Sequence, residues 1–408
     1  MIDHFFTVPL DHDEPGGPSI ELYAREVRGS GKDLPWLVFL NGGPGFASPR
    51  PVGRPGWLDR ALRDYRVLLL DQRGTGRSTP VSRAGLAKLG DAAAQAEYLT
   101  HFRADSIVRD AEAIRRALIG DAPWSLLGQS FGGFCATAYL STAPEGLREA
   151  FVTGGLPGLT ATADDVYRRL YPRVLAKNLA HYERFPGDVE QSVRVAGLLR
   201  ERDARLPGGR RLTVEAFQAL GNLLGSSTGS EVLHFLLEAP FDGTELSDAF
   251  LVGVERELTW AAGNPLYYVL HEPCYAQGEG ATSWSAQRVR AEFGEFDDDE
   301  RVLFTGEMIY PWMFDNDPLL QPLREAAHLL AERPSWPRLY DVDRLRGNMV
   351  PVAAAVYYED MYVDFDLSME TARTVGGVRP WVTNQYQHDG LRVSNGVVLD
   401  RLIELARD

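Results

Sequence analysis

The sequence predicts an α/β protein in which a mostly parallel sheet, flanked by helices, carries a large and mostly helical insertion. Short apolar segments alternate with turn-rich and amphipathic ones in residues 1–155. Strand patterns nearly vanish in residues 156–345 and return in residues 346–408. Alternation of this kind is typical of a parallel sheet with helices on both faces. Both ends of the chain are therefore expected to build one domain.

The expected strands are short, almost continuously apolar and end near Gly or Asp, as parallel strands covered on both faces should be. They lie at residues 36–40, 66–71, 124–128, 150–154, 350–358 and 380–385. A crossover helix is expected at residues 106–119, because its apolar residues recur at helical spacing and its other positions are polar. A last helix is expected at residues 395–406.

The insertion is predicted to be helical because its long segments are rich in Arg, Leu and Ala, as at residues 163–181 and 214–224. The simplest division gives three parts. Residues 1–155 are the N-terminal part of the core, residues 156–345 are the helical insertion, and residues 346–408 are the C-terminal part of the core.

The composition excludes several classes of partner. The 408 residues carry 42 basic and 57 acidic side chains, a net charge of −15, which argues against nucleic acid or an anionic membrane as partner. No apolar stretch approaches the ~18 residues of a membrane span, and no secretory signal is visible at the N-terminus. Cys135 and Cys274, the only cysteines, form neither a disulfide framework nor a metal pattern. We therefore expect a cytoplasmic protein.

The strongest chemical signal is GQSFGG at residues 128–133, which follows an expected strand and precedes an apolar helix. This setting gives the pattern G-x-S-x-G its meaning, because a sharp turn exposes the Ser130 hydroxyl above the sheet. Side chains at Gly128 and Gly132 would clash with the neighbouring strand and helix. The helix also directs its N-terminal amides towards the reacting centre. We predict that Ser130 is a nucleophile.

A serine hydroxyl is a weak nucleophile, so it needs a base, and the base needs an orienting acid. His388 is the only histidine after the last expected strand, in the loop YQHDG, and is the candidate base. The acid should follow the strand at residues 350–358. Asp360 is favoured because it is the aspartate nearest the end of this strand, with one position between them, and Asp364 is the first alternative. The remaining carboxylates there are Glu359 and Asp366.

Two further glycine-rich loops follow expected strands. In NGGPG, residues 41–45, the chain must fold back closely. The amides of Gly43 and Phe131 are therefore the predicted oxyanion hole, each worth about 3 kcal/mol. DQRGTGRS, residues 71–78, lacks the Lys-Ser/Thr of a P-loop and the spacing of a dinucleotide loop, so nucleotide binding is not expected. We interpret it as a rigid turn whose Arg73 and Arg77 brace the top of the sheet.

In this order and spacing, the three loops resemble the motifs HGGPG, DQRGxGxS and GxSxGG of the prolyl aminopeptidases (proline iminopeptidases) of the α/β-hydrolase superfamily. VPVAAAVYYED resembles the family's strand that ends at the catalytic aspartate, here Asp360. YQHDG resembles the loop of the catalytic histidine, here His388. The resemblance is specific at the two ends of the chain and only general in the insertion. One departure is Asn41, which stands where the family usually has histidine.

The resemblance implies an α/β-hydrolase fold whose insertion is a cap that binds the substrate's free amino terminus with carboxylates. A cationic amine in a partly dry pocket needs such partners. LHEPCYAQ resembles the cap segment that supplies one glutamate, here Glu272. TGEMIYPWM surrounds Glu307 with aromatic residues, as an acidic pocket for a pyrrolidine ring would. Glu238 and Glu279 are the alternatives.

These interpretations favour a serine aminopeptidase that releases N-terminal proline from short peptides with a free amino terminus. No metal or cofactor is implied, and the oligomeric state is not indicated. An esterase or amidase of the same fold without proline selectivity is the alternative among enzymes. A catalytically inactive receptor of this fold is the alternative outside them, although the intact set of Ser130, Asp360 and His388 disfavours it.

Overall fold

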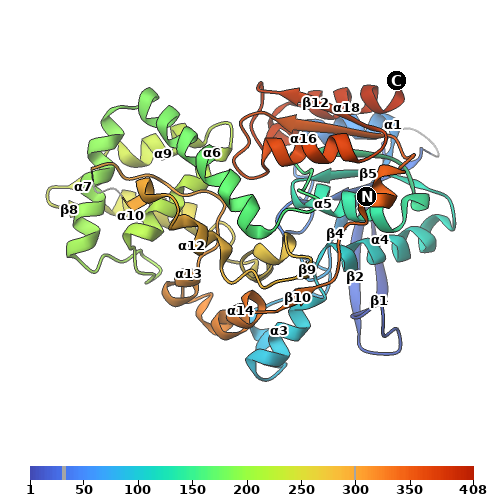
Figure 1. The fold of residues 1–408 in the computed structure, drawn as a ribbon, viewed down its shortest axis with the longest axis horizontal. Coiled ribbons are helices and arrows are strands. Elements are labelled where there is room, and N and C mark those ends of the chain that lie inside the picture. The colour runs from blue at the N-terminus through green and yellow to red at the C-terminus, as the bar shows by residue number, and fades with distance from the viewer. Residues whose placement is uncertain (30–33, 298–299) are drawn as a thin grey trace.

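An eight-stranded sheet forms the centre of the computed structural model, which describes residues 1–29, 34–297 and 300–408 (Figure 1). The strand order is β1-β2-β4-β3-β5-β6-β11-β12. β1 pairs antiparallel with β2, and β2 with β4, whereas the other pairs are parallel. The strands are β1 (Ile2–Pro9), β2 (Ser19–Val27), β3 (Trp36–Leu40), β4 (Arg66–Asp71), β5 (Trp124–Gln129), β6 (Leu147–Thr153), β11 (Val352–Tyr357) and β12 (Val378–Thr383).

All six predicted strands are confirmed, with ends that differ by three residues or fewer. The two strands of this sheet that the sequence did not reveal are β1 and β2, at one edge. β1 is largely exposed or half-buried, so its sequence lacks the continuous apolar run of a parallel strand. In an antiparallel hairpin at the edge of a sheet, one face is exposed to solvent, so apolar and polar residues alternate instead.

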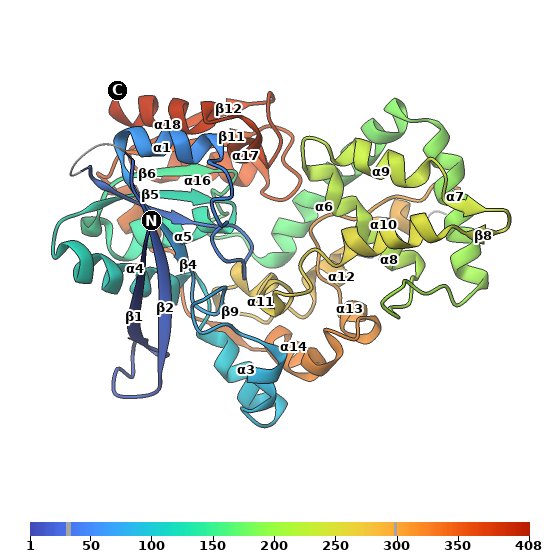
Figure 2. The same ribbon diagram turned by 180° about the vertical axis from the view of Figure 1, so that it is seen from behind.

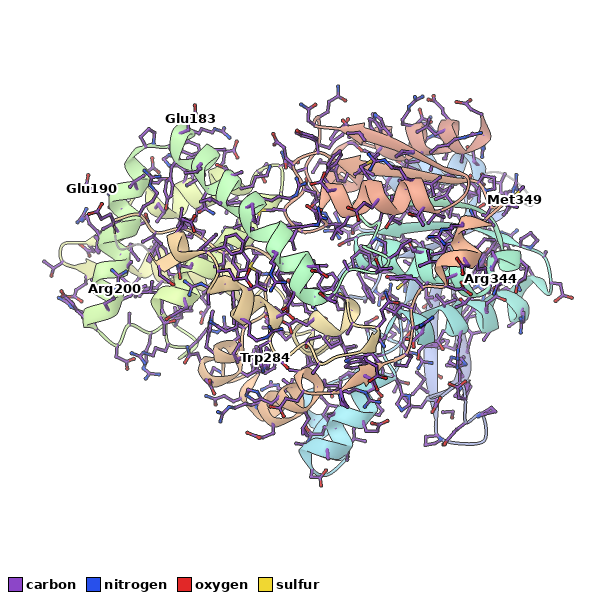
Figure 3. The ribbon with its side chains drawn as sticks, viewed as in Figure 1. Glu183, Glu190, Arg200, Trp284, Arg344 and Met349 are labelled. Carbon is purple, nitrogen blue, oxygen red and sulfur yellow. The ribbon has the colours of Figure 1, made fainter. Side chains whose placement is uncertain are left out.

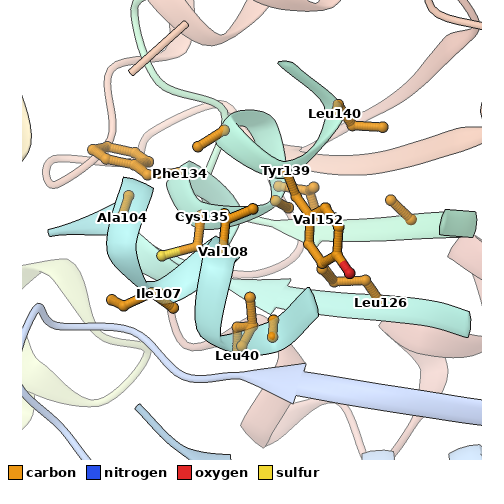
Figure 4. Packing of buried hydrophobic residues seen from close by; sticks show 14 of the residues in the cluster. Leu40, Ala104, Ile107, Val108, Leu126, Phe134, Cys135, Tyr139, Leu140 and Val152 are labelled. Carbon is orange, nitrogen blue, oxygen red and sulfur yellow. The ribbon is translucent and has the colours of Figure 1, made fainter. Parts of the chain in front are cut away.

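Helices cover both faces of the sheet. α4 (Ala104–Ile119), α5 (Phe131–Thr142) and α16 (Phe365–Thr374) pack on one face, and α1 (Gly56–Asp64) and α18 (Val397–Arg407) on the other. Successive strand residues serve opposite faces, because Val38 and Leu40 join the first core and Leu37 and Phe39 the second. Figure 4 shows the first core, where buried side chains of three strands meet α4 and α5: Leu40, Leu126, Val152, Ile107, Val108, Cys135 and Tyr139.

A mostly helical region follows β6 and lies beside the sheet (Figures 1 and 2). It has its own apolar core, and its longest helix is α6 (Ala163–Arg184). Its other helices among the described residues are α7 (Gly187–Glu201), α8 (Val214–Gln218), η2 (Ala219–Gly225), α9 (Gly229–Leu237), α10 (Asp248–Leu258), α11 (Pro265–Val269), η3 (Glu272–Cys274), α12 (Ser285–Arg290), η4 (Gly294–Asp297), α13 (Pro311–Asn316), η5 (Gln321–Leu323) and α14 (Arg324–Ala331). We call the part of the chain from α6 to α14, residues 163–331, the helical region.

Several contacts tie the helical region and the segment that follows it to the rest of the chain. α3 (Ala92–Thr100), from the N-terminal part, packs against α14, and both views place them side by side (Figures 1 and 2). α15 (Val342–Arg346) packs against α5 and α16 on the sheet. The division of the chain after residues 155 and 345 stays a prediction.

Several charged side chains are exposed on the outer surface of the helical region. Figure 3 shows Glu183 on α6 and Glu190 and Arg200 on α7, all exposed, at the end furthest from the sheet. Within the described residues, no helix combines the length and the apolar character needed to cross a membrane.

Candidate active site

Ser130 lies on the turn between β5 and α5, in a backbone conformation that few side chains adopt. Its φ is +55°, in the left-handed range that is rare for residues other than glycine. The flanking glycines allow this turn. A Cβ on Gly128 would lie 2.3 Å from the carbonyl oxygen of Gly132, and a Cβ on Gly132 would lie 2.0 Å from that of Leu40. The turn therefore needs both glycines.

His388 and Asp360 form a buried pair at the same end of the sheet. Asp360 lies in the turn after β11, and His388 lies in the loop after β12. The His388 Nδ1 atom is 2.7 Å from Asp360 Oδ2. The other oxygen, Oδ1, accepts hydrogen bonds from the amides of Tyr362 and Val363 at 2.8 and 3.1 Å. With Nδ1–H donating to the carboxylate, Nε2 is left as the acceptor.

The first alternative acid, Asp364, has another role. It precedes α16 and caps it, because its Oδ1 accepts a hydrogen bond from the amide of Leu367 at 2.9 Å. Its Oδ2 pairs with Arg173 of α6. The other two carboxylates are also engaged elsewhere, Glu359 with Lys177 and Asp366 with Arg173. The structure thus brings Asp360, and not these three, to His388.

A cleft of about 380 Å³ brings several of the predicted residues together. Ser130 and His388 line it from the sheet side, together with Asn41 and Gly43 of the NGGPG loop. The opposite lining comes from the helical region and includes Glu307. Phe131 is the first residue of α5, so its amide has no acceptor within the helix.

Polar side chains brace the loops around this cleft. Asn41 is buried, and its Nδ2 donates to the carbonyl of Ala47 at 2.8 Å, which ties down the loop that carries Gly43. Arg73 is buried and forms an ion pair with Asp110 of α4 at 2.7 Å. It also donates to three backbone carbonyls, those of Leu10 and His101 at 2.7 Å and that of Pro9 at 3.3 Å. The bracing predicted for Arg73 is confirmed.

The charges around His388 shift its titration. Burial acts to lower the pKa of His388, but the Asp360 carboxylate, through its charge and its hydrogen bond, raises that pKa above its ordinary 6.5. Glu307 raises it further, and Arg392 opposes this.

Two glutamates line the cleft from the helical region. Glu307 is half-buried, and its Oε1 accepts a hydrogen bond from the Tyr267 hydroxyl at 3.1 Å. Glu257, near the C-terminal end of α10, was not predicted; its carboxylate pairs with the exposed Arg256 at 2.8 Å. The cleft wall opposite Ser130 is therefore acidic.

Glu272, the other glutamate expected at the amine site, is not among the described residues that line this cleft. Its Oε1 accepts a hydrogen bond from the amide of Ala286 at 2.9 Å, which turns the carboxylate towards α12. Burial raises the pKa of Glu272 to about 7. The two alternatives, Glu238 and Glu279, are exposed and also lie outside the cleft lining.

The cleft residues that sequence reasoning missed include Trp260, Tyr267, Asp389 and Arg392. The two aromatic residues belong to a helical region whose apolar pattern also serves its own core, so their spacing gave no signal. Asp389 and Arg392 follow His388 closely in the sequence, and their nearness to the predicted base could have indicated them as site residues. In the part of the chain that the structure describes, no group of three or more His, Cys, Asp or Glu side chains is placed to hold a metal ion.

A glycine-flanked serine turn and an Asp–His pair at one end of a mostly parallel sheet define an α/β hydrolase, and a family model of the alpha/beta hydrolase fold matches residues 35–229. The proline iminopeptidase of Aeromonas sobria is 51% identical, covering 99% of this chain and 96% of that relative. The proline iminopeptidase aneH of Aspergillus aculeatus is 37% identical, covering 99% and 93%. The chain belongs to the proline iminopeptidase family, which confirms the resemblance of its motifs.

Solved structures also resemble the chain at low sequence identity. A proline iminopeptidase-related protein of Thermus thermophilus is 16% identical, covers 100% of this chain and 98% of its own, and has a TM-score of 0.44.

Proposed function

We propose that this protein is a serine-type aminopeptidase that releases N-terminal proline from peptides. The observation that carries the proposal is the shared cleft, which is lined by Ser130, by His388 with Asp360 hydrogen-bonded behind it, and by the acidic residue Glu307. Membership of the proline iminopeptidase family supports the same activity. The helical region, within the insertion expected at residues 156–345, would act as the cap over this cleft.

The proposed reaction proceeds through an acyl-enzyme. Ser130 Oγ attacks the scissile carbonyl carbon, and its proton passes to Nε2 of His388. Asp360 keeps the Nδ1–H tautomer in place, and the amides of Gly43 and Phe131 stabilise the oxyanion. His388 then gives the proton to the leaving nitrogen as the C–N bond breaks. Water, deprotonated by His388, hydrolyses the ester and releases proline.

Recognition of the amino terminus is proposed to come from the acidic wall. A protonated proline nitrogen would bind between the carboxylates of Glu307 and Glu257, since a cation in a shielded cleft requires opposite charge. Aromatic rings next to these glutamates provide a flat apolar surface for the pyrrolidine ring. Phe46 stacks on Trp260 at 5.2 Å between ring centroids, and Tyr267 packs edge-on against Trp260 at 5.0 Å.

The direct test is hydrolysis of proline-naphthylamide by the purified protein, beside the alanine and leucine naphthylamides and a p-nitrophenyl ester. Preference for the proline compound supports the proposal. Turnover of the ester without any aminoacyl naphthylamide would indicate the esterase alternative. Absence of turnover, with or without labelling of Ser130 by a fluorophosphonate, would favour the receptor alternative.

Glu307→Gln is expected to lower kcat/KM for proline-naphthylamide by about 10- to 150-fold, because one charge-assisted hydrogen bond to the substrate amine is lost. Hydrolysis of a p-nitrophenyl ester, which has no amine, should fall far less. Both substrates are measured on one protein preparation, so that partial unfolding is not read as lost recognition.

Glu272→Gln is the matched control, because this glutamate lies in the same region but hydrogen-bonds to Ala286. The ratio of the two activities should stay close to that of the wild type. A selective loss of the naphthylamide activity in Glu272→Gln, and not in Glu307→Gln, would transfer the amine site to Glu272.

The acid limb of the pH profile should report His388. The base must be neutral to accept the proton of Ser130, and the pKa of His388 is raised above 6.5. Activity on the p-nitrophenyl ester should therefore fall as the pH drops through a midpoint above 6.5. Glu307→Gln should lower this midpoint, because the carboxylate that helps to raise the pKa is gone. An unchanged midpoint would contradict the coupling of Glu307 to His388.

A further inference from the structure

Arg392 gives the cleft a basic end. It lies on α17 (Gly390–Val393), just after the loop of His388, and its side chain is exposed. Among the described residues that line the cleft, it is the only Arg or Lys. The reaction proposed above does not use it.

The guanidinium of Arg392 keeps most of its donors unused. Its Nη2 donates to Gln129 Oε1 at 2.9 Å, and it forms no ion pair with any residue that the structure describes. The nearby carboxylate of Asp389 is engaged by the helical region, where it accepts hydrogen bonds from the amide of Ser227 at 3.2 Å and from its hydroxyl at 2.6 Å. The guanidinium can therefore bind an anion that enters the cleft.

Arg392 also lies close to the reacting bond. A Cβ on Gly42 would lie 2.9 Å from Ser130 Cβ and 3.2 Å from Gln129 Oε1. Together with the 2.9 Å bond to Gln129, these contacts place Arg392 Nη2 no more than 9.0 Å from Ser130 Cβ. One residue, ~3.5 Å in length, separates the scissile carbonyl of a dipeptide from its C-terminal carboxylate. Together with the Cβ–Oγ bond, the approach of Oγ to the carbonyl and a final hydrogen bond, this length is enough for the carboxylate to reach Arg392.

The two charged ends of the cleft are separate. Glu257 and Glu307 also line a second cavity of about 60 Å³, which extends into the helical region and which Arg392 does not line. Arg392 belongs to the segment of His388, the residue that gives a proton to the leaving nitrogen in the proposed reaction. It therefore lies next to the residue that serves the leaving group, and it does not share the second cavity with the two glutamates.

We propose that Arg392 binds the C-terminal carboxylate of dipeptides with N-terminal proline, so that free dipeptides are the preferred substrates. The proposal rests on the proposed aminopeptidase function. A zwitterionic dipeptide would place its ammonium group at the acidic wall and its carboxylate at the planar guanidinium, which matches a carboxylate through two parallel hydrogen bonds. The cleft volume of about 380 Å³ is near the lower limit of ligand pockets, ~300 Å³, as a small substrate requires.

The test compares prolyl-alanine with its C-terminal amide, prolyl-alaninamide, in the wild type and in Arg392→Gln. The readout is the ratio of the two kcat/KM values, which does not depend on the fraction of active protein. We expect a ratio of at least about 10 in the wild type, because the charge-assisted pair forms only with the free acid. It should fall to about 1 in Arg392→Gln and keep an intermediate value in Arg392→Lys.

Arg401→Gln, which removes an exposed arginine of α18 that pairs with Glu404, is the control and should keep the wild-type ratio. A wild-type ratio near 1, or a ratio that Arg392→Gln leaves unchanged, would overturn the proposal. Failure of the proposed function looks different, since the wild type would then hydrolyse neither prolyl peptide nor proline-naphthylamide.

Discussion

Ser130→Ala is expected to reduce kcat for proline-naphthylamide by about 100,000-fold or more, as removal of the nucleophile does in serine peptidases that use a triad. Alanine has no oxygen to form the acyl-enzyme, and the oxyanion donors and the amine site alone support little turnover. The turn should persist, because its shape depends on Gly128 and Gly132. Initial rates at saturating substrate measure the effect, and labelling by a fluorophosphonate should be lost as well.

Ser226→Ala is the matched control, since Ser226 also lines the cleft and its hydroxyl donates to the carbonyl of Leu223 at 3.0 Å. This variant should label normally and keep its activity within about threefold, as expected for a serine without a role in the reaction. If Ser130→Ala kept more than about 1% of wild-type kcat, a loss much smaller than nucleophile removal causes, Ser130 would not be the nucleophile.

The sheet side of the site could be predicted from sequence because parallel strands carry their C-terminal ends to one edge. GQSFGG follows β5, Asp360 follows β11 and His388 follows β12, so three segments distant in sequence had to converge. The choice of Asp360 over Asp364 depended on where β11 ends, and the structure ends it at Tyr357. The helix that begins after Asp364 explains why this second aspartate serves as a cap.

The wall formed by the helical region could not be predicted in the same way. The helices of this region pack against an apolar core of their own, and that packing decides which of their side chains reach the cleft. The hydrophobic periodicity of a short helix shows its buried face, but it does not show which residues line a cleft. Glu307 and Glu272 both lie in segments rich in aromatic residues, yet one lines the cleft and the other turns towards the start of α12. Glu257 lies on an amphipathic helix and resembles any solvated carboxylate in sequence.

Asp360→Asn is expected to lower kcat by about 10,000-fold while the backbone stays in place. The amide oxygen of asparagine can still accept from the Tyr362 and Val363 amides, as Oδ1 does now. Its NH2 group, however, would face Nδ1 of His388 and favour the tautomer with the proton on Nε2, which cannot accept the proton of Ser130. Rates on proline-naphthylamide and on a p-nitrophenyl ester should fall together, because acylation of Ser130 is common to both.

Asp364→Asn separates loss of the acid from a general effect of removing a buried carboxylate nearby. Asparagine caps helices as well as aspartate does, so the bond to the Leu367 amide should survive, and the lost pair with Arg173 should lower the free energy of unfolding by about 1–3 kcal/mol. Its kcat should stay within a few-fold of wild type.

The pH profile distinguishes the two variants a second time, because the Asp360 charge raises the pKa of His388. The residual activity of Asp360→Asn should have an acid midpoint at lower pH than the wild type. The midpoint of Asp364→Asn should not shift. Reversed effects of the two variants would assign the orienting acid to Asp364.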